Sequence, residues 1–302
     1  MYRFKRILVN LNMNEHDTGL IQKAYKIAEM ANSEKLYFQY VEEKLDVPAE
    51  LVKEYPQLIE SVADFARDKI KDTIQIVNSS LLNPEPLVLV NEGSALDEIL
   101  KQVRINGIDL VISGVSSHLP ESRELATKLA RKAPCSVLVV PQGVELDFSN
   151  PGVALDFSEH SKDAYDQGLA FAKAGKAVKM EMIHVYEIPT GFHKTGRSYV
   201  EFAEIMKNNA KKNFQQLASD FETGNLEIIE NYLIESKTAE AIRKHVNKNK
   251  ISFLAVGAKG RSAGAALMLG SVSEKLIESL NIPVLAVKKK GSGLNILNVI
   301  FN

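Results

Sequence analysis

The sequence predicts an α/β protein built from two tandem domains, each with a five-stranded parallel sheet covered by helices on both faces. Short apolar runs alternate with longer stretches of helical spacing, and this alternation favours parallel strands joined by right-handed crossovers. The same series of strands and helices then occurs a second time. The length of 302 residues is enough for two domains of ordinary size.

The first copy begins with an apolar strand and continues with a helix whose apolar residues recur at helical spacing. Further strands and helices follow in alternation. We expect strands at residues 6–11, 35–41, 87–90, 109–113 and 136–140, and helices after the first at residues 56–77, 94–103 and 123–132.

A segment at residues 141–151 contains Pro, Gly, Asp and Asn and predicts a linker. The second copy follows, and its first helix carries Ala164, Gly168, Phe171 and Ala172 on one face. We expect strands at residues 153–156, 178–185, 226–234, 253–256 and 282–287, and later helices at residues 197–223, 238–247 and 272–280.

A nearly constant offset relates the two copies. Gly114 corresponds to Gly257 at an offset of 143, and Ser136 corresponds to Pro283 at an offset of 147. The single change falls in the loop before the last helix, so this loop is four residues longer in the second copy.

That longer loop carries a glycine motif, Gly257-x2-Gly260-x9-Gly270-Ser271, between an apolar strand and a helix. Glycines let a backbone approach a ligand with no Cβ in the way. A helix N-terminus offers N–H groups to an anion, and Ser271 can either cap the helix or contact a phosphate. Lys259 and Arg261 add positive charge beside the loop. The structural alternative is an ordinary glycine-rich connection.

The spacing of this motif resembles the ATP-binding signature of the universal stress protein family. The likeness continues into the strand after Pro283, and also covers Asp156 at the end of the first strand and Val185 at the end of the second. It implies tandem adenine-nucleotide-alpha-hydrolase-like (Rossmann-like) domains and ATP, with Mg²⁺, as ligand. The implied nucleotide-binding residues are Ala154, Leu155, Asp156, Val185, Val256, Gly257, Lys259, Gly260, Arg261, Gly270, Ser271 and Val272.

The first copy departs from this signature. Ser117 stands where Gly260 does, Arg123 and Glu124 stand against Gly270 and Ser271, and Asn12 replaces the aspartate. A carboxylate at that helix entrance would repel a phosphate. We therefore expect a degenerate domain at residues 1–143, a nucleotide-binding domain at residues 150–290, and an apolar tail at residues 291–302.

Composition narrows the function classes. A net charge of −1 argues against a general nucleic-acid binder, and no apolar run approaches the ~20 residues of a membrane helix. The lone Cys135 excludes an intramolecular disulfide and a multi-cysteine metal site. The histidines show no metal spacing, and we expect His184 to be a packed or surface residue rather than a base or ligand. We expect a cytoplasmic protein without membrane or nucleic-acid partners.

The resemblance to this family implies a regulatory or protective role in stress response rather than a dedicated enzyme. Slow ATP hydrolysis is the most that we expect, because no paired general acid and base stands out. Two alternatives stay open at this point: an interaction scaffold without nucleotide, and an adenylate-dependent enzyme of a related α/β class. The His-x-Gly-His and Ser-Gly-Gly-x-Asp-Ser stretches of such enzymes do not occur.

The resemblance also implies an assembly. Family members pair through their last strands, here residues 137–140 and 284–287, so we expect an intramolecular pseudo-dimer. Fusing two units raises the effective concentration of that pairing. The apolar tail follows a Gly291-Ser292-Gly293 hinge and could instead join two chains in a homodimer.

Overall fold

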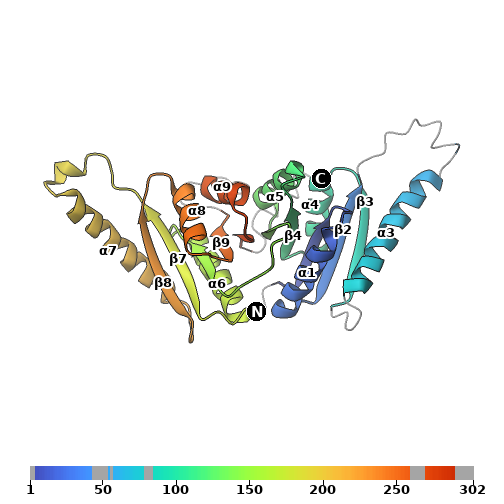
Figure 1. Cartoon of the computed structure of the whole chain (residues 1–302), viewed down its shortest axis with the longest axis horizontal. Coiled ribbons are helices and arrows are strands. Elements are labelled where there is room, and N and C mark those ends of the chain that lie inside the picture. The colour runs from blue at the N-terminus through green and yellow to red at the C-terminus, as the bar shows by residue number, and fades with distance from the viewer. Residues whose placement is uncertain (1–3, 43–53, 55–56, 78–83, 259–268, 290–302) are drawn as a thin grey trace. The chain divides into compact units, whose positions relative to one another are not determined.

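The structure is a computed structural model that describes residues 4–42, 54, 57–77, 84–258 and 269–289. The chain divides into two compact units at the Glu145–Leu146 peptide: unit 1 precedes it, and unit 2 covers Leu146–Lys289. Each unit is an α/β domain, and the same order of elements occurs in both. Figure 1 labels these elements.

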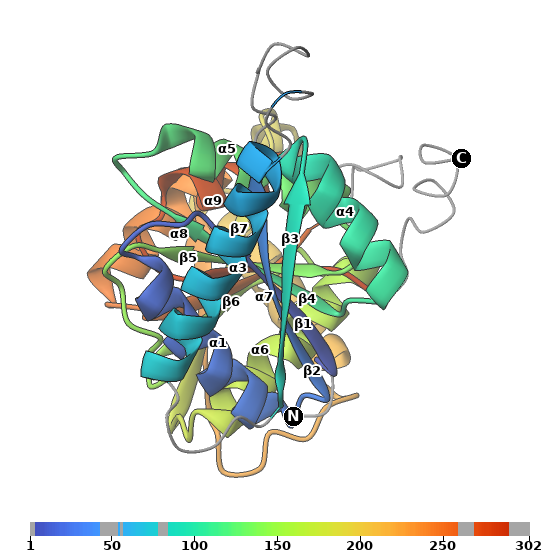
Figure 2. The ribbon, with the colours of Figure 1, turned by 90° about the vertical axis from the view of Figure 1, so that its right-hand side faces the viewer.

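The described part of unit 1 contains a parallel sheet with strand order β3-β2-β1-β4-β5. In Figure 2, α1 and α3 lie on one side of β3 and α4 lies on the other. The elements of unit 1 are β1 (Arg6–Leu11), α1 (Asp17–Ala31), β2 (Lys35–Glu42), α3 (Gln57–Val77), β3 (Pro86–Glu92), α4 (Ala95–Asn106), β4 (Leu110–Val115), α5 (Pro120–Lys132) and β5 (Ser136–Pro141).

Unit 2 repeats this topology, with strand order β8-β7-β6-β9-β10 and parallel pairing throughout. Its elements are β6 (Pro151–Ala154), α6 (Glu159–Ala174), β7 (Lys179–Tyr186), the 3₁₀ turn η1 (Phe192–Thr195), α7 (Tyr199–Ala218), β8 (Glu227–Ile234), α8 (Thr238–Lys248), β9 (Phe253–Gly257), α9 (Ser271–Ser279) and β10 (Val284–Val287). The predicted α/β fold with parallel strands is thus confirmed.

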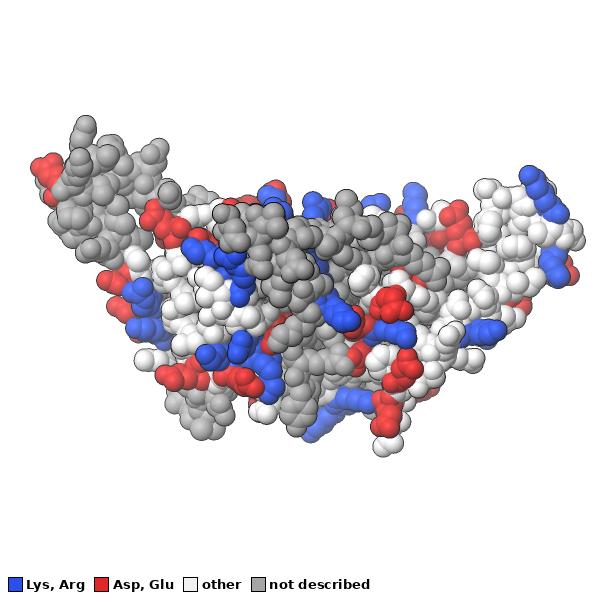
Figure 3. Space-filling model, turned by 180° about the vertical axis from the view of Figure 1, so that it is seen from behind, with Lys and Arg blue, Asp and Glu red and all other residues white. Residues whose placement is uncertain are grey.

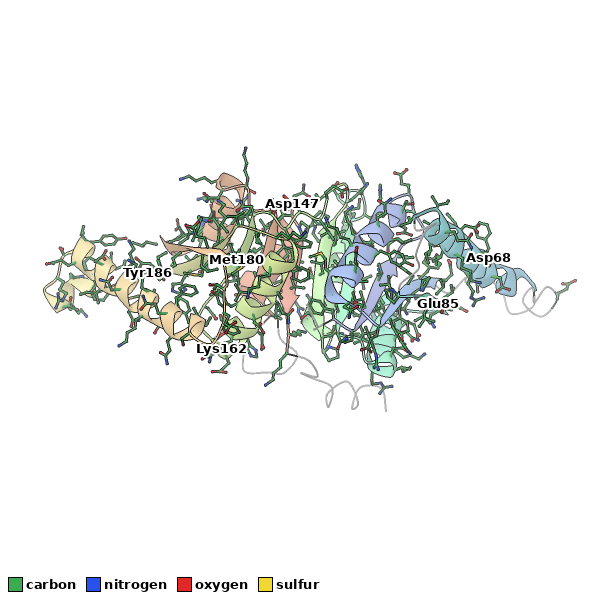
Figure 4. The ribbon with its side chains drawn as sticks, turned by 90° about the horizontal axis from the view of Figure 1, so that it is seen from below. Asp68, Glu85, Asp147, Lys162, Met180 and Tyr186 are labelled. Atoms are coloured by element: carbon green, nitrogen blue, oxygen red, sulfur yellow. The ribbon has the colours of Figure 1, made fainter. Side chains whose placement is uncertain are left out.

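Apolar strands and helix faces form the core of unit 2. The residues of β9 from Phe253 to Val256 are buried, and the rings of Phe148 and Phe171 pack on Phe253 with centroids 5.2 and 4.9 Å away. Gly168 of α6 faces this sheet, with Val153 and Ala255 opposite. On β7, the hydroxyl of Tyr186 donates to the carbonyl of Ala203 on α7 at 3.3 Å (Figure 4).

Several helix starts, among them the following three, differ from the sequence-based expectation by one to three residues. Helix α5 begins at Pro120 instead of residue 123, because proline suits the first helical turn and Glu121 complements the helix dipole. Helix α7 begins at Tyr199, where Ser198 and Glu201 form a capping box. Helix α9 begins at Ser271, one residue before the expected start.

The described residues contain no helix that is long and apolar enough to cross a membrane. Over the face drawn in Figure 3, the Lys and Arg side chains lie among Asp and Glu side chains. This distribution agrees with the net charge of −1, since no stripe of one sign covers the described part of that face.

Candidate functional site

The candidate site lies at the carboxyl ends of three neighbouring strands in unit 2. Ala154, the last residue of β6, is the sheet partner of both Ile183 on β7 and Val256 on β9. The strand order reverses between β6 and β9, and open α/β sheets bind ligands in the crevice at such a point. The chain order therefore brings the predicted residues of β6, β7 and β9 to one edge.

The glycine loop leaves this edge after β9 and returns to it at α9. The N–H of Gly270 donates to the carbonyl of Ala258 at 2.7 Å, and the hydroxyl of Ser273 donates to the carbonyl of Gly257 at 2.7 Å. These two bonds hold the start of α9 against the end of β9. The predicted residues Lys259, Gly260 and Arg261 lie outside the described residues.

The N-terminus of α9 has no side-chain cap among the described residues. Gly270 is its N-cap residue. Ser271 is the first helical residue and is exposed, so of its two expected roles the cap is excluded and the phosphate contact stays a prediction. The N–H groups of the first turn have no partner within a helix, so those of Ser271 and Val272 can meet an anion.

The conformation of Gly270 does not itself require glycine. Its φ of −65° and ψ of 140° are open to any residue. Gly257 ends β9 in an extended conformation, paired with Val287 of β10. At both positions the glycine can therefore serve the close approach of a ligand, and the turn itself does not demand it.

Asp156 lies two residues beyond β6, in the loop that leads to α6. Its Oδ1 accepts the N–H of Ser158 at 3.0 Å and the hydroxyl of Ser161 at 2.6 Å, while its own N–H donates to the oxygen of Ser161 at 3.0 Å. Ser158, and not Asp156, is the N-cap residue of α6. The carboxylate thus orders this loop while the side chain remains half-buried.

Val185 is half-buried near the end of β7, and its sheet partner on β8 is Leu233. The preceding residue, His184, is 9% exposed, and its ring stands 4.3 Å from the ring of Phe157, centroid to centroid. Its Nδ1 donates to the carbonyl of Leu155 at 2.8 Å. Of the two expected environments, packed or surface, the structure shows the packed one, and the sequence carried no signal for this hydrogen bond.

In the corresponding loop of unit 1, the carboxylate comes from a different position in the sequence. Asn12 stands at the position of Asp156, and Asp17 stands at that of Ser161. The N–H of Asn12 donates to Asp17 at 3.1 Å, in place of the bond from Asp156 to Ser161. Burial raises the pKa of the Asp17 carboxyl, and hydrogen bonds from the backbone partly oppose that shift. The carboxylate in unit 1 is therefore that of Asp17, at the start of α1, and it accepts hydrogen bonds from the backbone of its own loop.

The loop after β4 in unit 1 uses its own N–H groups. Those of Ser116 and His118 donate to the hydroxyls of Ser122 and Ser116 at 3.0 and 3.1 Å, and that of Ser122 donates to the carbonyl of Leu119 at 3.0 Å. The N–H groups of Ser116, His118 and Ser122 are therefore engaged inside the protein. Pro120 contributes no donor at all.

Arg123 and Glu124 do not lie at the entrance of α5, as the sequence alignment implied. The helix begins three residues earlier, so both lie within it, and Glu124 pairs with Lys128 at 2.6 Å. That hydrogen bond lowers the pKa of the exposed Glu124 carboxyl. The carboxylate of the first helical turn is instead that of Glu121.

A hollow of about 240 Å³ lies at the ends of β1 and β4 in unit 1, in the position that matches the candidate site of unit 2. The carboxylates of Glu15, Asp17 and Glu145 line it, together with the ammonium of Lys23. Lys23 pairs with Glu145 at 3.4 Å. The lining of this hollow thus contains three acidic residues and one lysine. The described residues contain no cluster of His, Cys, Asp and Glu that could hold a metal ion.

Comparison with known proteins gives a consistent result for both units. The sequence model of the universal stress protein family matches residues 3–141 and, a second time, residues 150–288. Universal stress protein YxiE of Bacillus subtilis is 29% identical over 148 residues, which are 47% of this chain and 99% of that protein. Universal stress protein MJ0577 of Methanocaldococcus jannaschii is 26% identical over 152 residues, which are 45% of this chain and 93% of that protein.

A solved universal stress protein from Archaeoglobus fulgidus has the same fold over nearly the whole chain. The TM-score is 0.61 at 15% identity, covering 94% of this chain and 96% of that one. At that identity the likeness concerns the fold alone. The two matches to the family domain cover most of the sequence, and they carry the assignment. The chain therefore belongs to the universal stress protein family and contains two copies of its domain.

Proposed function

We propose that this protein binds ATP, with Mg²⁺, in its second domain only, and acts in stress response as a regulatory or protective binding protein. The proposed nucleotide-binding domain is residues 150–290, and residues 1–143 form a domain that has lost the site. The observation that carries the proposal is the loop before α5, where the N–H groups of Ser116 and His118 donate to hydroxyls within unit 1. Neither α5 nor α9 has a side-chain cap among the described residues, so the two domains differ in this loop and in the glycine motif, and not in helix capping.

The phosphates would lie at the N-terminus of α9. The first-turn N–H groups of Ser271 and Val272 would donate to phosphate oxygens, which the helix dipole also favours. Lys259 and Arg261 would add positive charge from the glycine loop, and Gly257, Gly260 and Gly270 would leave room for close approach.

The nucleoside would occupy the strand ends beside the phosphates. Val185 would offer an apolar surface to the adenine, and the backbone of Ala154, Leu155 and Val256 would lie beneath the nucleoside. Asp156 is the carboxylate at this edge, and its orientation is held by Ser158 and Ser161. These residues bind and orient a nucleotide, and none of them forms the base–nucleophile pair that fast hydrolysis requires.

A calorimetric titration of the full chain with ATP and MgCl₂ tests the proposal. We expect a stoichiometry near one nucleotide per chain. Replacing Gly260 and Gly270 with bulky residues should remove the binding, and the matched replacement of Ser117 and Arg123 in the first domain should leave it unchanged. A stoichiometry near two, or binding that survives the first pair of substitutions, contradicts the proposal.

Native mass spectrometry of freshly purified protein supplies an independent test. A co-purified adenine nucleotide at one per chain would support the second-domain site, and its mass would identify the species. Sustained production of ADP by the pure protein at a rate typical of an enzyme would favour the alternative of an adenylate-dependent enzyme.

We further propose that the two domains pair through residues 137–140 and 284–287 as an intramolecular pseudo-dimer. Both segments are apolar strands of the kind that invites pairing when left at a sheet edge. Light scattering should then give the mass of a single chain, and X-ray scattering should give a radius of gyration near ~19 Å, the value for one compact body of this length. A mass of two chains would indicate a homodimer instead.

A further inference from the structure

We propose that His184 is a positioning residue for the candidate nucleotide site, which it serves by fixing the backbone on which Asp156 stands, with Phe157 as its packing partner. The proposal rests on the proposed function, because Asp156 is expected at the nucleotide. The role assigned to His184 is to hold the backbone on both sides of Asp156, which core packing and the glycine motif do not do.

Leu155 is the residue at which the chain leaves the sheet. Residues of β7 form hydrogen bonds with both its N–H and its carbonyl. Its N–H donates to the carbonyl of Ile183 at 2.9 Å, and its carbonyl accepts the Nδ1–H of His184 at 2.8 Å. Leu155 is 5% exposed and His184 is 9% exposed, so water is largely kept from this carbonyl. A buried carbonyl without a donor is costly, and the imidazole supplies the donor.

The hydrogen bond also determines how the ring is protonated. A carbonyl oxygen only accepts, so Nδ1 must carry a hydrogen. The imidazole plane is then oriented by the bond, and the ring of Phe157 lies against it at 4.3 Å with an interplanar angle of 30°. Phe157 has a φ of +59°, which is uncommon for a bulky residue, and contact with the His184 ring stabilises that conformation.

Asp156 lies between these two held residues. Leu155 on one side is bound to His184, and Phe157 on the other side packs against the same ring. The carboxylate is then directed by Ser158 and Ser161. If the imidazole were lost, the carbonyl of Leu155 would lose its donor and Phe157 would lose its ring contact, while the N–H of Leu155 would keep its bond to Ile183. The backbone that carries Asp156 would then be held less firmly.

Unit 1 shows that the turn itself does not need this arrangement. Met13, at the position of Phe157, also has a positive φ of 56°. The residue opposite Leu11 is Tyr40, whose hydroxyl donates to Glu42 at 2.6 Å. The unit that lacks the aspartate thus also lacks the imidazole and the phenyl ring, yet it makes the same turn. The histidine therefore serves the aspartate, and chain reversal alone does not explain it.

The test uses the full chain and titration with ATP and MgCl₂. His184→Leu removes the donor, whereas His184→Asn can place its Nδ2 near the position of Nδ1 and keep the bond. We expect His184→Leu to weaken binding about tenfold or more, since it leaves a buried carbonyl without a donor. His184→Asn should stay within about threefold of the parent, and Tyr40→Leu in unit 1 should have no effect on binding.

A double-mutant cycle separates positioning from general damage. In an Asp156→Asn background, His184→Leu should weaken the remaining binding by less than about twofold, because the two residues act through one contact. Additive losses, or equal losses for His184→Asn and His184→Leu, would overturn the proposal. Circular dichroism and melting curves confirm that each variant is folded before its affinity is interpreted.

Amide hydrogen exchange provides a readout that does not depend on ATP. If the parent binds no ATP, the proposed function fails, but the positioning role is still tested by exchange in the segment 156–158. Faster exchange in His184→Leu and parental exchange in His184→Asn would support the role. Unchanged exchange in both variants would reject it.

Discussion

At the scale of single residues, the entrance of α9 is the most sensitive point of the proposed site. We predict that Gly270→Glu abolishes ATP binding while the fold survives. The backbone of Gly270 has φ and ψ values that any residue adopts, so the substitution introduces no strain there. The new carboxylate would repel the phosphates and would itself compete for the first-turn N–H groups.

Titration calorimetry of Gly270→Glu and Gly270→Gln separates charge from size. The glutamine variant adds nearly the same volume without the charge, so it should retain more affinity than the glutamate variant. Parental affinity in Gly270→Glu would show that the phosphates do not bind at this helix.

The second prediction at this scale concerns the stability of a Tyr165 variant. The side chain of Tyr165 is fully buried on α6 between the rings of Phe214 and Phe221, and its hydroxyl has no hydrogen-bond partner among the described residues. Removing such a hydroxyl relieves a desolvation cost. We expect Tyr165→Phe to leave the free energy of unfolding at pH 7 unchanged or raised by about 1 kcal/mol.

The same residue predicts a dependence on alkaline pH. Burial, with a smaller contribution from the charge of Glu230, raises the pKa of Tyr165 to about 12. The unfolded chain releases this proton near pH ~10 and the folded chain does so later, so stability falls as pH rises between these values. Urea unfolding at several pH values above 9 should show a shallower fall for Tyr165→Phe. Parallel curves for the two proteins would contradict this assignment.

At the scale of elements, two glycines of α6 have opposite roles. A Cβ on Gly168 would lie 3.5 Å from Val153 and 3.6 Å from Ala255, which is ordinary contact distance. A Cβ on Gly175, at the end of the helix, would overlap the Cβ of Phe148. Close approach to neighbouring atoms therefore demands glycine at the helix end and not in its middle.

We predict that Gly168→Ala raises the free energy of unfolding by up to about 1 kcal/mol, because alanine favours the helix and restricts the unfolded chain. Gly175→Ala should lower it by about 1–3 kcal/mol through overpacking against Phe148. Urea unfolding of the two variants provides the comparison. A loss of stability in Gly168→Ala would mean that α6 packs more tightly on the sheet than these distances indicate.

At the scale of the whole molecule, the tail at residues 291–302 makes the remaining prediction, and it lies outside the described residues. Its apolar run, Leu294 to Phe301, is too apolar to remain in water over its whole length. Deleting residues 291–302 should lower the melting temperature or change the mass in light scattering, because the tail would cover apolar surface within a chain or between chains. If both quantities stay the same, the tail has no structural role.

The sequence by itself determined the parts of this protein that depend on local pattern. Apolar periodicity placed the strands and helices, and the offset between Gly114 and Gly257 showed the repeat. The same motif located the loop between β9 and α9, because glycine spacing is read along the chain. Helix starts were less certain, as α5 shows, because Pro120 and Glu121 began the helix before its apolar spacing did.

Only the tertiary structure decided where the polar groups find their partners. His184 bonds to a carbonyl 29 residues away, and the N–H groups before α5 are engaged by side chains that periodicity does not place. The bond of His184 depends on which strands are neighbours and in what register, whereas the bonds before α5 depend on the path of a single loop. The physical reason is that apolar patterning acts within an element, whereas a buried hydrogen bond joins atoms that the fold alone brings together.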